Sequence, residues 1–144
     1  MTRRNAIIRL VSLFIALLAV WGQSLTAQTL QCPCGIITLK VDSDVACSVT
    51  ICYQLSPLGP IACRAVAPGG STTVPCPLYA LGIRLCDGSI HWIIQGTPLP
   101  PVGACTPTLT LARGCCVRAC RALDDTAMCP VFEIKRAPCS TTDC

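Results

Sequence analysis

Apolar and polar side chains alternate along several short stretches of this chain, most clearly within residues 36–94. In the first stretch, Ile37, Leu39 and Val41 share one side and polar residues occupy the other. A two-residue period is typical of a half-buried antiparallel strand, and helical spacing fits these stretches poorly. We therefore predict strands over the following segments: residues 36–41, 47–53, 81–86, 107–112 and 131–135.

Residues that favour chain reversal separate these segments. Pro and Gly cluster at residues 56–60 and 67–71, and Asp87-Gly88 stands between two apolar runs. An Asp-Gly pair in that setting is the strongest short signal for a β-hairpin. Strands that recur roughly every ten residues predict a small sandwich or a barrel-like sheet.

The pattern changes at residues 97–103, where three Pro fall within four residues and favour an extended connection. Beyond this Pro-rich connection lies a Cys-rich C-terminal portion, residues 104–144. There Cys116, Cys120 and Leu123 recur at helical spacing, compatible with one or two helical turns between residues 114 and 123. The expected fold is mainly β: a small, disulfide-rich, β-sandwich-like protein with room for one short helix.

The N-terminus predicts export. Arg3, Arg4 and Arg9 stand without an acidic neighbour, and an apolar run of twelve residues with one polar member follows them. A basic start, an apolar run and a small-residue exit indicate a cleaved signal peptide over residues 1–27. A membrane anchor needs about 20 apolar residues, so we expect no stable membrane insertion after cleavage. The mature chain, which opens with a disulfide-stapled β module at residues 28–96, is expected to be secreted, extracellular or periplasmic.

Removal of the signal peptide changes the charge of the chain. Three of the eleven basic residues lie in that segment and none of the seven acidic ones does. The mature chain then has eight basic residues against seven acidic ones, a net charge of about +1. Such a balance gives no support to nucleic acid as a partner.

Cysteine is the dominant feature of the composition. All 14 cysteines lie beyond the expected signal peptide. In a short exported chain this density predicts a disulfide scaffold, because cross-links lower the entropy of an unfolded chain that can bury only limited apolar surface. The disulfide candidates are Cys32, Cys34, Cys47, Cys52, Cys63, Cys76, Cys86, Cys105, Cys115, Cys116, Cys120, Cys129, Cys139 and Cys144.

The parity of these cysteines restricts their pairing. Seven precede the Pro-rich connection and seven follow it. If every thiol pairs within the chain, an odd number of bridges must cross the connection. The alternative is an unpaired Cys on each side, which favours covalent association between chains.

A shift of 53 residues superimposes four cysteines of residues 52–86 on four cysteines of the C-terminal portion. The pairs are Cys52 with Cys105, Cys63 with Cys116, Cys76 with Cys129, and Cys86 with Cys139. Similarity at a fixed offset is the mark of an internal repeat, so the C-terminal portion is a candidate degenerate copy.

The sequence does not point to catalysis, a cofactor or a metal. An oxidising compartment favours disulfides over metal thiolates, and the chain has one histidine and no C-x-x-C sequence. Asp87, Ser89 and His91 share a strand face, yet no nucleophile elbow or oxyanion-binding element accompanies them. We therefore expect no enzymatic activity, no cofactor and no metal site.

The scarcity of charge in the mature chain favours association with a protein. The first hypothesis is a secreted, disulfide-stabilised structural or interaction protein without catalytic activity, whose partner is an unidentified protein or a second copy of itself. The alternative is a secreted binding protein for a small apolar or anionic ligand. Arg113, Arg118 and Arg121 form the one local excess of positive charge and are the candidate contacts for an anion.

Overall fold

The computed structural model describes residues 28–123, 129–139 and 144, so the expected signal peptide at residues 1–27 lies outside the described residues. The described residues form nine strands and one short 3₁₀ turn: β1 (Ile36–Val41), β2 (Val49–Gln54), β3 (Ile61–Val66), β4 (Ser71–Pro75), β5 (Ala80–Arg84), β6 (Ile90–Gln95), β7 (Leu109–Thr110), η1 (Ala112–Gly114), β8 (Cys116–Arg121) and β9 (Val131–Arg136). Among these residues, no helix is both long enough and apolar enough to span a membrane.

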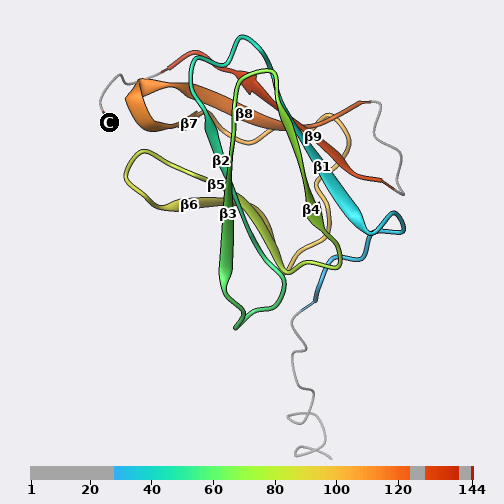
Figure 1. Ribbon diagram of the computed structural model, residues 1–144. Coiled ribbons are helices and arrows are strands. Elements are labelled where there is room, and N and C mark those ends of the chain that lie inside the picture. Colours follow the sequence, from blue (N-terminus) through green and yellow to red (C-terminus); the bar gives the residue numbers. More distant parts are fainter. Residues whose placement is uncertain (1–27, 124–128, 140–143) are drawn as a thin grey trace, which may run out of the picture.

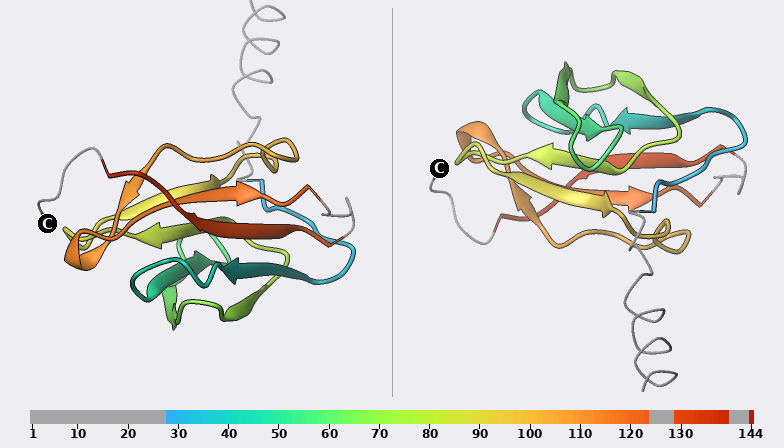
Figure 2. Two further views of the ribbon diagram at one scale, coloured as in Figure 1. Left: turned by 90° about the horizontal axis from the view of Figure 1, so that it is seen from above. Right: turned by 90° about the horizontal axis from the view of Figure 1, so that it is seen from below.

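The strands form two sheets that lie against each other as layers (Figures 1 and 2). One sheet has the order β4-β1-β9-β8-β7 and the other the order β3-β2-β5-β6. Neighbouring strands are antiparallel except for β1 and β9, which are parallel. The prediction of a mainly β, sandwich-like fold is therefore confirmed.

The core lies between the two sheets and follows the predicted alternation. Ile37, Leu39 and Val41 of β1 are buried, and Val49 and Ile51 of β2 are buried from the opposite sheet. One contiguous cluster contains side chains from both layers. Since each sheet has one apolar face, packing the two faces together removes both from water.

The larger sheet combines strands from both sides of the Pro-rich connection. Strand β1 precedes the connection and β9 follows it, yet residues Thr38 to Val41 pair with Val131 to Ile134. Phe132 and Ile134 of β9 are fully buried in the shared core. The N-terminal and C-terminal portions thus contribute to one hydrophobic core.

The helical turns considered between residues 114 and 123 are wrong: this segment is strand β8. Val117 and Ala119 alternate with exposed Arg118, and their burial follows the two-residue period of a strand. Pairing of β8 with β9 over five residue pairs decides the outcome, because tertiary hydrogen bonding outweighs a short helical pattern. The 3₁₀ turn η1 precedes β8, and the described residues contain no α-helix.

Ten of the cysteines form five disulfides: Cys32–Cys76, Cys34–Cys129, Cys52–Cys63, Cys105–Cys120 and Cys116–Cys139. The Cys34–Cys129 bridge crosses the Pro-rich connection and ties the start of the described chain to the segment before β9. Cys52 and Cys63 are joined, whereas their counterparts at the 53-residue offset, Cys105 and Cys116, each bond elsewhere.

Candidate functional site

The β2–β3 hairpin projects from the smaller sheet and is constrained by a disulfide between its strands and by side-chain contacts at its turn. The disulfide between Cys52 and Cys63 links the two strands at directly opposed positions. At the turn, the Gln54 side-chain amide donates to the carbonyl oxygens of Pro57, at 3.1 Å, and Gly59, at 2.7 Å. These contacts satisfy the turn carbonyls from within the hairpin and fix its shape.

Strand β3 stands at the end of its sheet and is exposed on both faces. It has β2 as its one neighbour in the sheet. Of its six residues, Val66 alone is buried and Cys63 is half-buried. Strand β4, at the end of the other sheet, is similarly exposed, with Val74 as its one buried residue. The side chains and the free edge of β3 are therefore accessible to solvent.

The free edge of β3 carries backbone groups that point away from β2. The Cα atoms of Cys52 and Cys63 are 4.1 Å apart, a separation typical of an antiparallel pair that exchanges no hydrogen bonds. The N–H and C=O groups of Cys63 therefore point outward. Because this orientation repeats every second residue, Ile61 and Ala65 present their backbone groups in the same direction.

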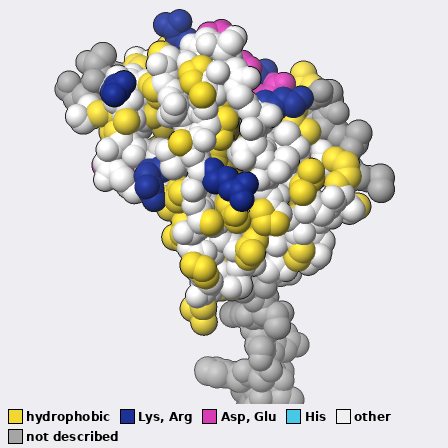
Figure 3. Space-filling view, in the orientation of Figure 1, with side chains coloured by type: hydrophobic (Ala, Val, Ile, Leu, Met, Phe, Trp, Pro, Cys, Tyr) yellow, Lys and Arg dark blue, Asp and Glu magenta, His cyan; other side chains and the backbone are white. Residues whose placement is uncertain are grey.

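Apolar side chains surround the turn beside this edge. Leu58 is 100% exposed, and Leu55 and Ile61 are 49% and 48% exposed. In the space-filling view, hydrophobic atoms gather on the lower part of the molecule and on the projection formed by the β2–β3 turn (Figure 3). A contiguous exposed apolar patch commonly marks an interaction surface. We call the free edge of β3 and the three residues Leu55, Leu58 and Ile61 the β3 surface.

The cation on β3 is turned away from the free edge. The Arg64 guanidinium lies over the ring of Tyr53, 5.9 Å from its centroid, and donates to the Thr73 carbonyl oxygen of β4. Arg64 lies on the core-facing side of β3, opposite buried Ile51. Its charge therefore lies over the rim between the sheets. On the outer face, the Arg84 guanidinium of β5 donates to the Cys63 sulfur at 3.3 Å, so a second cation lies beside the middle of β3.

The three arginines expected to meet an anion do not gather in one place. Arg118 is exposed and its Nε donates to the Thr108 hydroxyl at 3.3 Å. Arg121 is buried, and its guanidinium donates to the carbonyl oxygen of Pro100 at 2.7 Å. Arg113 lies in η1 with a positive φ of 64°. Because residues 118 and 121 are an odd number apart on a strand, their side chains leave opposite faces.

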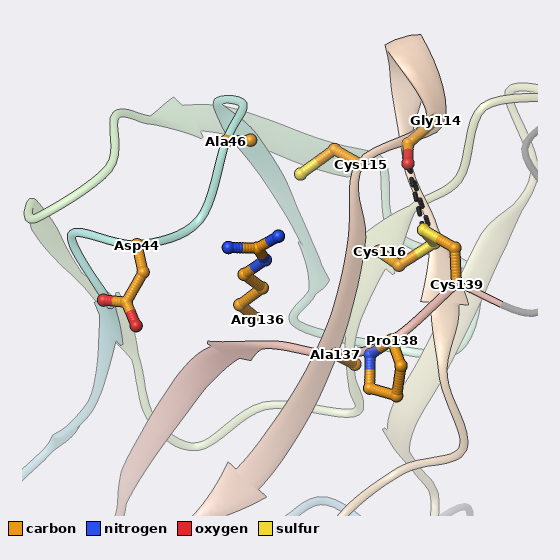
Figure 4. Close-up of a pocket in the computed structure, with 9 residues that line it drawn as sticks. All are labelled: Asp44, Ala46, Gly114, Cys115, Cys116, Arg136, Ala137, Pro138 and Cys139. Atoms are coloured by element: carbon orange, nitrogen blue, oxygen red, sulfur yellow. Dashed lines mark hydrogen bonds between the residues drawn. A yellow bond between two sulfur atoms is a disulfide. The ribbon is translucent and has the colours of Figure 1, made fainter.

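An open hollow of about 620 Å³ lies beside the start of β8. Arg136 points into it between Asp44 and the backbone around Cys115, and the Cys116–Cys139 disulfide forms part of its wall (Figure 4). The lining is mixed, with both signs of charge and several small residues. Among the described residues, no group of three or more His, Cys, Asp or Glu is placed to hold a metal ion.

A smaller hollow between the sheets bears on the ligand-binding hypothesis. It measures about 210 Å³ and is lined by Trp92, Phe132 and Pro100 together with half-buried His91. Pockets for small organic ligands are usually about 300–1,000 Å³. The hollow is apolar, as a pocket for an apolar ligand must be, but it is smaller than the usual pocket for a small organic molecule.

Asp87 and Ser89 have a structural role in the β5–β6 hairpin. The Asp87 carboxylate accepts hydrogen bonds from the Ser89 backbone N–H at 2.9 Å and from its hydroxyl at 2.6 Å. These bonds lower the pKa of Asp87. Gly88 supplies the positive φ of 83° that the turn requires. The carboxylate and hydroxyl are thus engaged in the turn that the Asp-Gly pair predicted.

The hydrophobic pattern does not predict two of the strands, β4 and β3. The sequence of β3, Ile-Ala-Cys-Arg-Ala-Val, lacks clear alternation because neither face is fully buried. The available signals were the β-branched residues at its two ends and the Pro-Gly turns on both sides.

No protein-family model matches this chain, and neither a curated protein nor a solved structure matches it.

Proposed function

We propose that this chain is a secreted, non-catalytic interaction protein that associates with a second copy of itself through the β3 surface. The observation that carries the proposal is the exposure of an apolar terminal strand on both faces, with its backbone edge open. Proteins usually protect such an edge with charge, Pro or a covering segment. Here the one charge on the strand, Arg64, is directed toward Tyr53 and β4.

The geometry of β3 fits antiparallel pairing with its own copy. A two-fold axis at Cys63 matches the outward groups of Ile61 with those of Ala65 on the second copy, so every outward donor meets an acceptor. The same register sets each Arg64 opposite Ala62 rather than opposite the other Arg64. Two four-stranded sheets then continue as one, and the apolar residues at the hairpin turns lie beside the junction.

Export is supported by two independent features. The apolar run within residues 1–27 has the composition of a signal peptide. Five disulfides fit a protein that matures in an oxidising compartment. The bridges also make a small sandwich robust enough to carry an exposed edge outside the cell.

The test is the molar mass of the oxidised protein over a range of concentrations, measured by size-exclusion chromatography with light scattering. We expect a dimer at high concentration that dissociates on dilution. Ala65→Pro removes an outward N–H without touching the ladder to β2, and Leu58→Lys places a charge at the apolar turn. Each variant should weaken dimerisation at least about tenfold, which corresponds to roughly 1.4 kcal/mol.

Leu123→Lys is the matched control, because Leu123 is also highly exposed, at 84%, but follows β8 in the other sheet. This variant should dimerise like the unaltered protein. A protein that remains monomeric at every concentration would exclude the proposal. So would a Leu123→Lys variant that dissociates as readily as Leu58→Lys, because association would then not depend on β3.

The ligand-binding alternative rests on the apolar hollow beside Trp92 and Phe132. It is less well supported, because the hollow is small and Arg121 is engaged by the Pro-rich connection. Saturable quenching of tryptophan fluorescence by a small apolar compound, in a protein that stays monomeric, would favour this alternative.

A further inference from the structure

Four cysteines within the described residues stand outside the five disulfides: Cys47, Cys86, Cys115 and Cys144. They occupy one end of the sandwich and fall into two adjacent pairs. In each pair, one member belongs to the segment before the Pro-rich connection and the other to the segment after it.

The first pair consists of Cys47 and Cys115. The two side chains are near neighbours, and both pack in or against the main hydrophobic cluster. Ala46, the residue before Cys47, lines the same hollow as Cys115, whose side chain points toward Ala46 in Figure 4. Burial and the neighbouring thiol raise the pKa of Cys47 to about 12, so this cysteine is a neutral thiol at neutral pH.

The second pair consists of Cys86 and Cys144, whose side chains are also near neighbours. The same short segment positions both residues. The backbone N–H of Cys86 donates to the Thr110 carbonyl oxygen at 3.2 Å, and the Cys144 thiol donates to the carbonyl oxygen of the next residue, Leu111, at 2.8 Å. Two cysteines from distant parts of the chain are thus brought together over consecutive carbonyl groups.

We propose that Cys47 with Cys115, and Cys86 with Cys144, are two further oxidation sites, and that the mature protein closes both pairs as disulfides. In each reaction two S–H bonds break and one S–S bond forms. The two electrons and two protons pass to a disulfide-containing oxidant, such as a protein disulfide or a small-molecule disulfide, which is reduced to two thiols.

The consequence is a set of covalent cross-links across the sandwich. Cys47 precedes β2 and Cys86 follows β5 in the smaller sheet, whereas Cys115 directly precedes β8 in the larger sheet. With the Cys34–Cys129 bridge, three disulfides then cross the Pro-rich connection, an odd number as parity requires. The two pairs differ in access: Cys115 is buried and Cys144 is exposed, so the Cys86–Cys144 bridge should be reduced first.

The test is alkylation of the oxidised full-length protein in denaturant, before and after reduction, followed by mass spectrometry. We expect no alkylated cysteine before reduction and cross-linked peptides that contain the two proposed pairs. Fragmentation must separate Cys115 from adjacent Cys116, because Cys116 bonds to Cys139. Four alkylated thiols, or bridges of Cys47 with Cys86 and of Cys115 with Cys144, would overturn the proposal.

Single substitutions identify the partners independently of peptide mapping. Cys47→Ser should release one thiol, and the alkylated residue should be Cys115. Cys86→Ser should release Cys144. If Cys47→Ser instead releases Cys144, the pairing is wrong even though all cysteines are oxidised. During titration with a reductant, the thiols of Cys86 and Cys144 should be alkylated before those of Cys47 and Cys115, and the reverse order would contradict the assigned difference in access.

Discussion

The guanidinium of Arg121 donates a hydrogen bond to the carbonyl oxygen of Pro100 at 2.7 Å and fastens the Pro-rich connection to β8. The backbone of Arg121 adds two more contacts, since its carbonyl accepts from Gly103 N–H and its N–H donates to the Ala104 carbonyl, both at 2.9 Å. A segment rich in Pro has few N–H groups of its own, so a side-chain donor and backbone pairing from β8 define its course.

Arg121→Met removes the guanidinium donor and keeps much of the buried side-chain volume. We expect a loss of about 1.5–3 kcal/mol in the free energy of unfolding, because a part-buried carbonyl loses a charged partner. Amide hydrogen exchange at Gly103 should accelerate. Arg118→Met is the control, because exposed Arg118 should contribute less than about 1 kcal/mol. Equal effects of the two substitutions would contradict this role of Arg121.

Gly82 of β5 should tolerate no side chain, for steric reasons. A Cβ atom there would lie 2.6 Å from the His91 carbonyl oxygen, 2.7 Å from a methyl group of Ile90 and 2.9 Å from the Trp92 ring. We expect Gly82→Ala to cost about 1–3 kcal/mol in urea unfolding, through displacement of β6.

Gly88 provides a contrast, because its surroundings are open and its constraint is a positive φ of 83°. Since Asn tolerates this conformation better than Ala, Gly88→Asn should be more stable than Gly88→Ala. At position 82, by contrast, the Asn variant should be no more stable than the Ala variant. If Asn restored stability at Gly82 as well, backbone conformation rather than contact with β6 would be the cause there.

The disulfides should differ in their contributions to the free energy of unfolding, according to the lengths of the loops they close. Cys34–Cys129 spans 95 residues and Cys105–Cys120 spans 15. In the chain-entropy description, loops of these sizes correspond to about 4.7 and 3 kcal/mol. The double variant Cys34→Ser/Cys129→Ser should therefore unfold at a lower denaturant concentration than Cys105→Ser/Cys120→Ser. The opposite order would show that strain or residual structure outweighs loop entropy.

The β5–β6 turn predicts a weak dependence of stability on acidic pH. Hydrogen bonds from Ser89 lower the pKa of Asp87, so the folded state favours the ionised carboxylate. The resulting stabilisation is present above the ordinary carboxyl pKa and is lost as the pH falls through the lowered value. In an NMR titration, Ser89→Ala should raise the pKa of Asp87 toward its ordinary range. An unchanged pKa in the variant would assign the shift to another cause.

Strands with one buried face could be located from the sequence because their alternation reports burial directly. β1, β2 and β9 belong to this class, and the Asp-Gly pair correctly marked the β5–β6 hairpin. The alternation does not predict strand β3, because an edge strand that is exposed on both faces has no consistently apolar face in its sequence. In strand β8, Cys116 and Cys120 imitate helical spacing, because the positions of cysteines follow disulfide geometry.

The sequence by itself determined the mainly β character and the turns, since these follow from local patterning. The parity of the cysteines added a conditional result: a bridge must cross the Pro-rich connection if every thiol pairs within the chain. The tertiary structure decided which cysteines meet, that β1 and β9 run side by side, and that β3 lies at an open edge. It also placed the side chains of Arg118 and Arg121 on opposite faces of β8, although they are neighbours in the sequence. Contacts between distant segments depend on how two sheets bury their apolar faces together, and no local pattern contains that information.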